Sequence, residues 1–176
     1  MISSIRDDNP VMYLFHKGLL ELRWMPSPDE AAVDVPEEPY TLPFGEAKTV
    51  KEGKDVTIVT VSRMVYEALW SAKELEKEGI SAEIIDLRTL VPLDKKTVIN
   101  SVKKTGRLLV VDEDYRSYGM TGEIVSLVSE EIGHDLKTPP RRLGYPDVPV
   151  PYGGALEKFV LPDKDRIEGT VKEMMK

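Results

Sequence analysis

The sequence predicts an α/β fold in which a mostly parallel sheet is covered by helices on both faces. From Lys54 onward, short runs rich in β-branched residues alternate with longer segments whose apolar residues recur every three to four positions. This alternation favours a parallel sheet, because the chain returns to a neighbouring parallel strand through a crossover helix. The 176 residues are enough for one domain of about 120–150 residues and an additional segment.

The first predicted strand and helix follow directly after Lys54. Residues 56–61 form a continuous run of β-branched residues, as expected for a strand buried on both faces. Ser62 is a candidate N-cap for the helix that follows, and Gly79 is placed to end it. The apolar face of this helix consists of Val65, Ala68, Leu69, Ala72 and Leu75.

The second strand and helix repeat this arrangement. Residues 81–87 are expected to form a strand, and Asp94 to cap a helix that ends near Lys103, Lys104 and Gly106. The two lysines suit the negative end of the helix dipole. The apolar positions of this helix are Val98, Ile99 and Val102.

The last part of the chain continues the alternation. Residues 108–111 and 141–143 are predicted strands, and a helix opened by Thr121 or Gly122 and stopped at Gly133 lies between them. Residues 145–162 are rich in proline and are expected to be irregular. Asp163 is then the expected cap of a terminal helix whose apolar positions are Ile167, Val171 and Met174.

The N-terminal part has a different character. Residues 11–15 form a short apolar run after an Asn-Pro turn signal and are predicted to be a buried strand. Residues 26–44 combine prolines with acidic residues, which favours an extended linker, with a surface loop as the alternative.

Charge and composition exclude several classes of protein. The net charge of −7 argues against nucleic-acid binding, and no apolar run approaches the roughly 20 residues that span a bilayer. The absence of cysteine excludes disulfides, thiolate catalysis and cysteine-ligated metal sites. His16 and His134 are the only two histidines, so a multi-histidine metal site is excluded as well. Without a signal peptide at the N-terminus, we expect a soluble cytoplasmic protein that binds neither nucleic acid nor membrane.

Three motifs are candidates for binding or chemistry. The segment Tyr118-Gly-Met-Thr-Gly122 opens a helix and either presents N–H groups to an anion or makes a tight turn. The acidic triplet Asp112-Glu113-Asp114 follows a strand, where it either holds a cation or acts as acid or base, or is solvated or paired with Arg116. For His16 and His134 we expect exposure or helix-end capping, because neither has a recognisable spacing to an acid or nucleophile.

Two connecting segments also need an explanation. Residues 86–94 join a strand to a helix through a proline-containing turn, and their residue types alone assign them no function. Residues 145–162 form a long connector that either packs against a partner subunit or wraps its own domain. The residue patterns therefore predict an α/β domain with an appended connector and no defined activity.

Seven sequence blocks occur in the same order as in one known family. They are Ile5-Arg-Asp-Asp-Asn-Pro-Val11, Glu38-Pro-Tyr40 with Pro43-Phe-Gly-Glu-Ala47, Gly53-Lys-Asp-Val-Thr-Ile58, Asp86-Leu-Arg-Thr-Leu-Val-Pro-Leu-Asp94, Ser101-Val-Lys-Lys-Thr-Gly-Arg107, Pro146-Asp-Val-Pro149, and Leu156-Glu157 with Leu161-Pro162. In these blocks the chain resembles the C-terminal half of the beta subunit of thiamine-diphosphate-dependent 2-oxo acid dehydrogenases, the first component of pyruvate, branched-chain and acetoin dehydrogenase complexes.

This resemblance implies a division of the chain. Residues 45–176 would form the transketolase C-terminal domain, a three-layer α/β/α sandwich with a mostly parallel five-stranded sheet and one antiparallel edge strand. Residues 1–25 would be a remnant of the preceding pyrimidine-binding domain, joined by the linker 26–44. The family's catalytic glutamate and histidine lie in that preceding domain, and its Mg-diphosphate site lies on the alpha subunit. His16 does not match the catalytic histidine, so we expect no catalytic, cofactor-binding or metal-binding residue here.

The function that the resemblance implies is structural. In the whole complex, the enzyme uses thiamine diphosphate and Mg to decarboxylate or cleave its substrate and passes the acyl group to lipoamide. This chain is expected to contact an alpha subunit and a second beta subunit, as a homodimer, and to dock the lipoyl acyltransferase core. Lys137 and Lys176 place positive charge where such docking favours negative groups, which argues against the docking. The alternative is a stand-alone non-catalytic interaction or small-ligand-binding domain.

Overall fold

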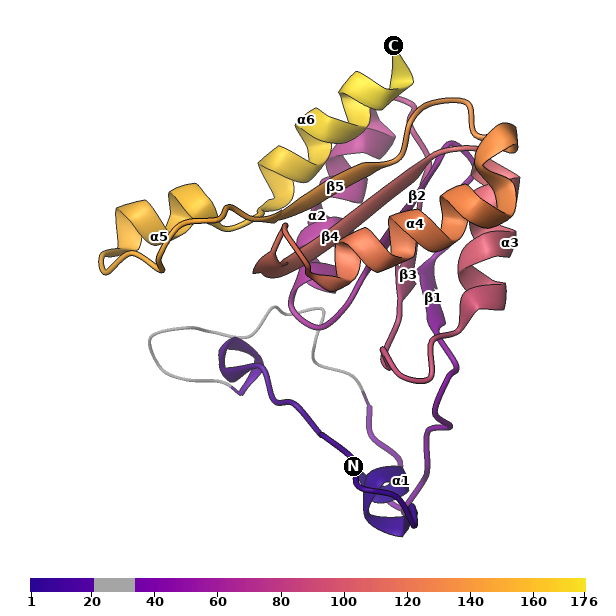
Figure 1. The fold of residues 1–176 in the computed structure, drawn as a ribbon, viewed down its shortest axis with the longest axis vertical. Helices are drawn as coiled ribbons and strands as arrows, with labels where there is room; N and C mark the ends of the chain where they lie inside the picture. The colour runs from indigo at the N-terminus through magenta and orange to yellow at the C-terminus, as the bar shows by residue number, and fades with distance from the viewer. Residues whose placement is uncertain (21–33) are drawn as a thin grey trace.

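The computed structural model describes residues 1–20 and 34–176 and has a five-stranded sheet in the order β1-β3-β2-β4-β5 (Figure 1). The strands are β1 (Lys48–Lys51), β2 (Val56–Thr60), β3 (Ala82–Asp86), β4 (Leu108–Tyr115) and β5 (Arg141–Tyr145). The helical segments are α1 (Ile2–Arg6), η1 (Lys17–Leu19), α2 (Met64–Lys77), α3 (Lys95–Thr105), α4 (Met120–Ile132), η3 (Gly133–Asp135), α5 (Gly154–Val160) and α6 (Lys164–Met175).

The pairing of the strands confirms the predicted fold class. β2 pairs in parallel with β3 and β4, and β4 pairs in parallel with β5. β1 pairs with β3 in the antiparallel direction and forms one edge of the sheet. Residue patterns alone did not predict β1, because Lys-Thr-Val-Lys contains a single strongly apolar residue, whereas the family resemblance implied such an edge strand.

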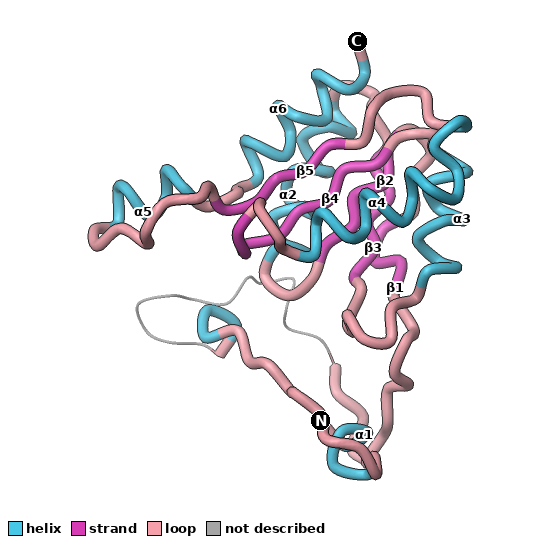
Figure 2. The backbone as a smooth tube through the Cα atoms, in the orientation of Figure 1, coloured by secondary structure: helices cyan, strands magenta, loops and turns pink. Residues whose placement is uncertain are grey.

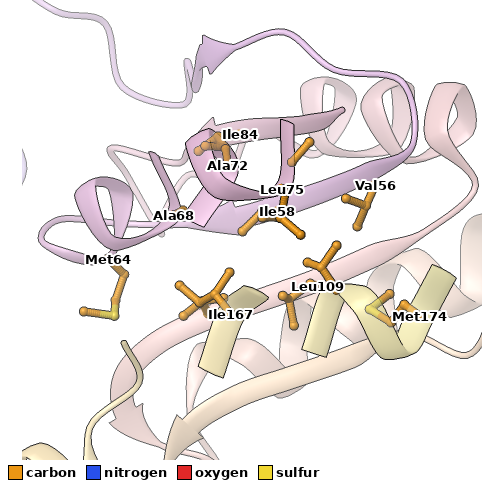
Figure 3. Close-up of a cluster of buried hydrophobic side chains, with 13 residues drawn as sticks. Val56, Ile58, Met64, Ala68, Ala72, Leu75, Ile84, Leu109, Ile167 and Met174 are labelled. Carbon is orange, nitrogen blue, oxygen red and sulfur yellow. The ribbon is translucent and has the colours of Figure 1, made fainter. Parts of the chain in front are cut away.

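Helices cover both faces of the sheet, as predicted (Figure 2). Alternate side chains of β2 point to opposite faces. Ile58 packs against α2 and α6 in one core, and Val59 packs against α3 and α4 in the other. Figure 3 shows the first of these cores, in which Ile167 and Met174 of α6 meet Ile58 and Leu109 of the sheet. All five residues of β2 are buried, which explains its continuous β-branched run.

Most predicted helix ends are confirmed. Asp94 accepts a hydrogen bond from the Thr97 N–H, and Asp163 accepts one from the Arg166 N–H. Gly79 and Gly106 follow their helices with φ values of +80° and +74°, a conformation that favours glycine. α4 ends at Ile132, before Gly133, as expected.

The predicted N-cap at Ser62 is wrong. α2 begins at Met64, and Ser62 lies in the left-handed region with a φ of +59°. The backbone carbonyl of Ser62, not its hydroxyl, accepts from the Val65 N–H. The start of α4 also differs, because it begins at Met120 after Gly119, shortly before the predicted Thr121 or Gly122.

The predicted strand at residues 11–15 is wrong as well. These residues are extended but belong to no strand, and Met12 and Leu14 are 88% and 81% exposed. A single strand cannot satisfy its backbone groups without a neighbour, and within the described residues the sheet offers none to this segment. The short helix α1 was not predicted, and the Ser3 hydroxyl joins it to the backbone of Leu42.

The linker and the connector that the sequence predicts have different outcomes. Residues 21–33 lie outside the described residues, so the linker prediction is open there, while residues 34–43 contain no helix or strand. The connector 145–162 is not wholly irregular, because it contains α5. Within the described residues, we find no helix long and apolar enough to cross a membrane.

Candidate functional site

The carboxyl edge of the sheet is the candidate functional site. Ser62, Arg88 and Tyr118 follow the neighbouring parallel strands β2, β3 and β4 and have φ values of +59°, +58° and +63°. Left-handed backbone at residues other than glycine is uncommon and concentrates at functional sites. In open α/β sheets, binding sites also lie outside the carboxyl ends of the strands.

The acidic triplet lies inside β4, which extends beyond its predicted end to Tyr115. Asp112 is partly buried, and burial raises the pKa of its carboxyl above the ordinary value. One oxygen of Asp112 accepts from the Glu113 N–H, and one oxygen of Asp114 accepts from the Tyr115 N–H. Asp112 and Asp114 thus each accept from the backbone N–H of the next residue, and this arrangement does not indicate a shared cation.

Glu113 has a partner that the sequence did not indicate. Its Oε2 lies 2.8 Å from the Nε2 of His16, so the pair joins the N-terminal segment to β4. Among the described ion pairs, none links the triplet to Arg116. His134 lies away from this pair, in η3. Its side chain is 81% exposed and lies beside the carboxylate of Asp135.

The segment from Tyr118 to Gly122 makes a tight turn into α4. A Cβ atom on Gly119 would lie 2.2 Å from the carbonyl oxygen of Tyr115, so the turn needs glycine at this position. The Tyr118 side chain is fully exposed beside it. The close approach of the backbone explains the glycine without an anion.

The connector from Asp86 to Asp94 fastens the beginning of the domain. The Asp94 carboxylate accepts hydrogen bonds from the N–H groups of Thr97 and Ala47, each at 3.0 Å. The Thr89 hydroxyl accepts from the Gly45 N–H at 3.0 Å and donates to the Pro92 carbonyl. These contacts give a structural role to the motif that residue types alone left unexplained.

Asp86 lies at the beginning of the same connector. Burial raises the pKa of its carboxyl, and the Arg88 N–H partly offsets this by hydrogen bonding to Oδ1. Asp86 ends β3 between Lys48 of β1 and Thr60 of β2, and these neighbouring strands partly cover it.

Two buried carboxylates escaped the sequence analysis. Glu67 in α2 accepts from the N–H of Lys164 at the start of α6, and burial raises the pKa of its carboxyl. Glu83 in β3 is 3% exposed and pairs with Lys104 of α3. The helical spacing of Glu67 from Met64 and Ser71, which are buried, was an available signal.

The connector 145–162 contains two distinct parts. Its first part wraps the domain, because Tyr115 donates to the Val148 carbonyl and Ser117 bonds to Asp147. Its second part, residues 150–159, projects beyond the sheet and includes all of α5 except the buried Val160 (Figure 1). We call this second part the arm. Its large apolar side chains are exposed; they are Val150, Tyr152, Leu156 and Phe159.

The two lysines expected to oppose docking differ in their surroundings. Lys137 donates from Nζ to the Thr105 carbonyl at 2.9 Å and so satisfies the carboxyl end of α3. Lys176 follows α6 and is exposed. The charge of Lys137 is therefore directed in part toward its own domain.

Comparisons with known proteins agree with the fold of the domain. Residues 45–167 match the family model described as "Transketolase, C-terminal domain". The chain is 37% identical to the 2-oxoisovalerate dehydrogenase subunit beta of Bacillus subtilis over 98% of this chain and 50% of that protein. It is 42% identical to the acetoin:2,6-dichlorophenolindophenol oxidoreductase subunit beta of Cupriavidus necator over 100% of this chain and 49% of that protein.

A solved structure shares the fold. A chain described as "Split gene transketolase, inactive beta4 tetramer" aligns with a TM-score of 0.65 and 28% identity over 86% of this chain and 47% of that chain. The present chain spans about half the length of the curated relatives it matches. It belongs to the transketolase C-terminal domain family, and its relatives include beta subunits of 2-oxo acid and acetoin dehydrogenases.

Proposed function

We propose that this chain is the C-terminal domain of the beta subunit of a thiamine-diphosphate-dependent 2-oxo acid or acetoin dehydrogenase. Its role is to build the interface between subunits and to dock partners, while the chemistry takes place on other parts of the whole enzyme. In that enzyme, substrate is decarboxylated or cleaved, and the acyl group passes to lipoamide. The family membership of residues 45–167 and the named relatives support this proposal.

The observation that carries the interface role is the exposure of the arm. Tyr152 and Phe159 are 104% and 80% exposed, and of the seven residues of α5 only Val160 is buried. A helix of this length is marginal in water by itself, because too few hydrogen bonds offset the cost of forming the first turn. Aromatic side chains that are exposed together are typical of the anchors of protein interfaces.

The contacts of the described carboxylates support our proposal that thiamine diphosphate and Mg bind elsewhere in the enzyme. A bound diphosphate and its Mg²⁺ would need carboxylate oxygens that converge and are free to act as ligands. Asp112 and Asp114 bond to neighbouring backbone N–H groups, and Glu113 pairs with His16. Glu67 is held by Lys164 and Arg63. We therefore place the cofactor on other parts of the enzyme and derive no catalytic step in this chain.

The partners follow from this assignment. We expect a second beta chain, giving a homodimer, and an alpha subunit to cover exposed apolar surface that includes the arm. Docking of a lipoyl acyltransferase core would meet the positive charge of Lys176, which weakens binding to a basic partner.

The experiment is sedimentation velocity of the chain, alone and with the alpha subunit of a 2-oxo acid dehydrogenase. Self-association or a mixed complex supports the interface role. A strict monomer at high concentration without affinity for the alpha subunit would overturn it.

A further inference from the structure

The geometry points to His16 as a latch that fastens the N-terminal segment to the carboxyl edge of the sheet. One ring nitrogen accepts from the Gly18 N–H, and the other donates to the carboxylate of Glu113. This inference concerns how residues 16–20 are held on the domain. It does not depend on the reaction that the whole enzyme performs.

The two contacts use opposite sides of one imidazole ring. Nδ1 lies 3.1 Å from the Gly18 nitrogen and caps η1, and Nε2 lies 2.8 Å from Oε2 of Glu113. The side chains of His16 and Glu113 are 25% and 26% exposed, and Gly18 is buried. Both contacts are therefore partly shielded from water, which strengthens them relative to an exposed pair.

Glu113 lies in β4 just beyond the paired positions, since pairing with β2 reaches Val110 and pairing with β5 reaches Val111 and resumes at Tyr115. It follows Leu109, Val110 and Val111 in β4, each of which has no exposed surface. β4 is hydrogen-bonded to β2 on one side and to β5 on the other. His16, in contrast, follows residues 11–15, which pair with no strand within residues 1–20 and 34–176. The latch thus connects the N-terminal segment to the carboxyl end of β4, two residues beyond the buried Val111.

The hydrogen bond from Gly18 also assigns the proton of the ring. A nitrogen that accepts a hydrogen bond cannot carry a proton of its own, so in this geometry the proton of neutral His16 lies on Nε2. That proton points to Glu113. Charged residues flank both members of the pair in the sequence. Lys17 follows His16, and Asp112 and Asp114 lie on either side of Glu113. A doubly protonated ring would keep the pair with Glu113 but lose the cap on η1.

Two substitutions separate the two halves of the latch. His16→Asn keeps an acceptor near the position of Nδ1 for the Gly18 N–H but does not reach Glu113. His16→Gln keeps a donor near the position of Nε2 but leaves the Gly18 N–H without its acceptor. Lys17→Gln is the control, because it lies beside the latch and changes charge without altering either contact. Circular dichroism first verifies that each variant folds.

Hydrogen exchange of the full chain is the measurement. We expect the backbone amides of residues 17–20 to exchange roughly tenfold faster in His16→Asn, because a hydrogen bond to a charged group is lost. Glu113→Ala should cause the same increase, and the double variant should add nothing further. Glu113→Gln should change exchange much less, since its amide oxygen still accepts from Nε2–H.

Nitrogen NMR of the imidazole tests the proton assignment independently. In the neutral ring we expect Nε2 to carry the proton and Nδ1 to be unprotonated. Exchange at residues 17–20 that is unchanged in both His16→Asn and Glu113→Ala would overturn the latch. A neutral ring with its proton on Nδ1 would overturn the assigned hydrogen bonds.

Discussion

Replacing Asp94 should loosen the attachment of residues 45–47 to the rest of the domain. Asp94→Ala removes the cap of α3, which costs about 1 kcal/mol. It also leaves the Ala47 N–H without its acceptor, which costs about 1 kcal/mol more. We therefore expect a loss of roughly 2 kcal/mol in the free energy of unfolding, or a fall of about 4–8 °C in Tm for a chain of this size.

Asp94→Asn is the matched control, because it separates these two contributions. The remaining carbonyl oxygen of the amide still accepts from the Thr97 N–H, whereas the amide nitrogen cannot accept from Ala47. We expect a loss of roughly 1 kcal/mol, measured by urea denaturation near neutral pH. If Asp94→Ala were as stable as wild type, the two hydrogen bonds to Asp94 would not stabilise the fold as described. Equal losses in the two variants would refute the separation of cap from attachment.

The effect of Asp94 should also depend on pH. Burial, the strongest single influence, acts to raise the pKa of Asp94, but hydrogen bonds from Thr97 and from the Ala47 N–H together outweigh it. The pKa of the Asp94 carboxyl in the folded chain therefore lies below its ordinary value of 3.8. A lowered carboxyl pKa stabilises the fold above pH 3.8, and this contribution is lost as the pH falls through the lowered pKa. The difference between wild type and Asp94→Ala should accordingly shrink in acid.

Three further predictions concern other parts of the chain. Gly119→Ala should destabilise the fold by about 2 kcal/mol or more, because its Cβ meets the Tyr115 carbonyl, and thermal unfolding measures this. Burial raises the pKa of the Glu67 carboxyl in the folded chain. The contribution of Glu67 to the free energy of unfolding is therefore greatest below the ordinary pKa and declines as the pH rises through the raised pKa. Glu67→Gln should remove this decline from a plot of stability against pH. Phe159→Ser should reduce association in sedimentation while changing stability by less than about 0.5 kcal/mol, and a large loss of stability would indicate that the arm packs on its own domain.

Local sequence signals predicted the regular part of the fold well. The β-branched run of β2 and the caps at Asp94 and Asp163 correspond to strong local preferences, and the structure confirms them. β1 lacked such a signal, because an edge strand needs few apolar residues. The apolar run at residues 11–15 had the signal of a strand but has no sheet neighbour among the described residues.

The candidate site was less predictable, because its contacts join residues far apart in sequence. Nothing near His16 indicates Glu113, and nothing near Glu67 indicates Lys164. The acidic triplet looked like a possible cation site while its strand was expected to end at Val111. In the longer β4, Asp112 and Asp114 instead accept from neighbouring backbone N–H groups, and Glu113 pairs with the distant His16.

Decarboxylation by the purified chain measures whether the chemistry takes place on these residues or on other parts of the enzyme. With thiamine diphosphate, Mg²⁺ and an artificial electron acceptor, the chain is supplied with carboxyl-labelled pyruvate or 2-oxoisovalerate. We expect no release of labelled carbon dioxide above the rate without protein. Release that requires both the chain and thiamine diphosphate would contradict this expectation, because it would place the reactive machinery on these residues.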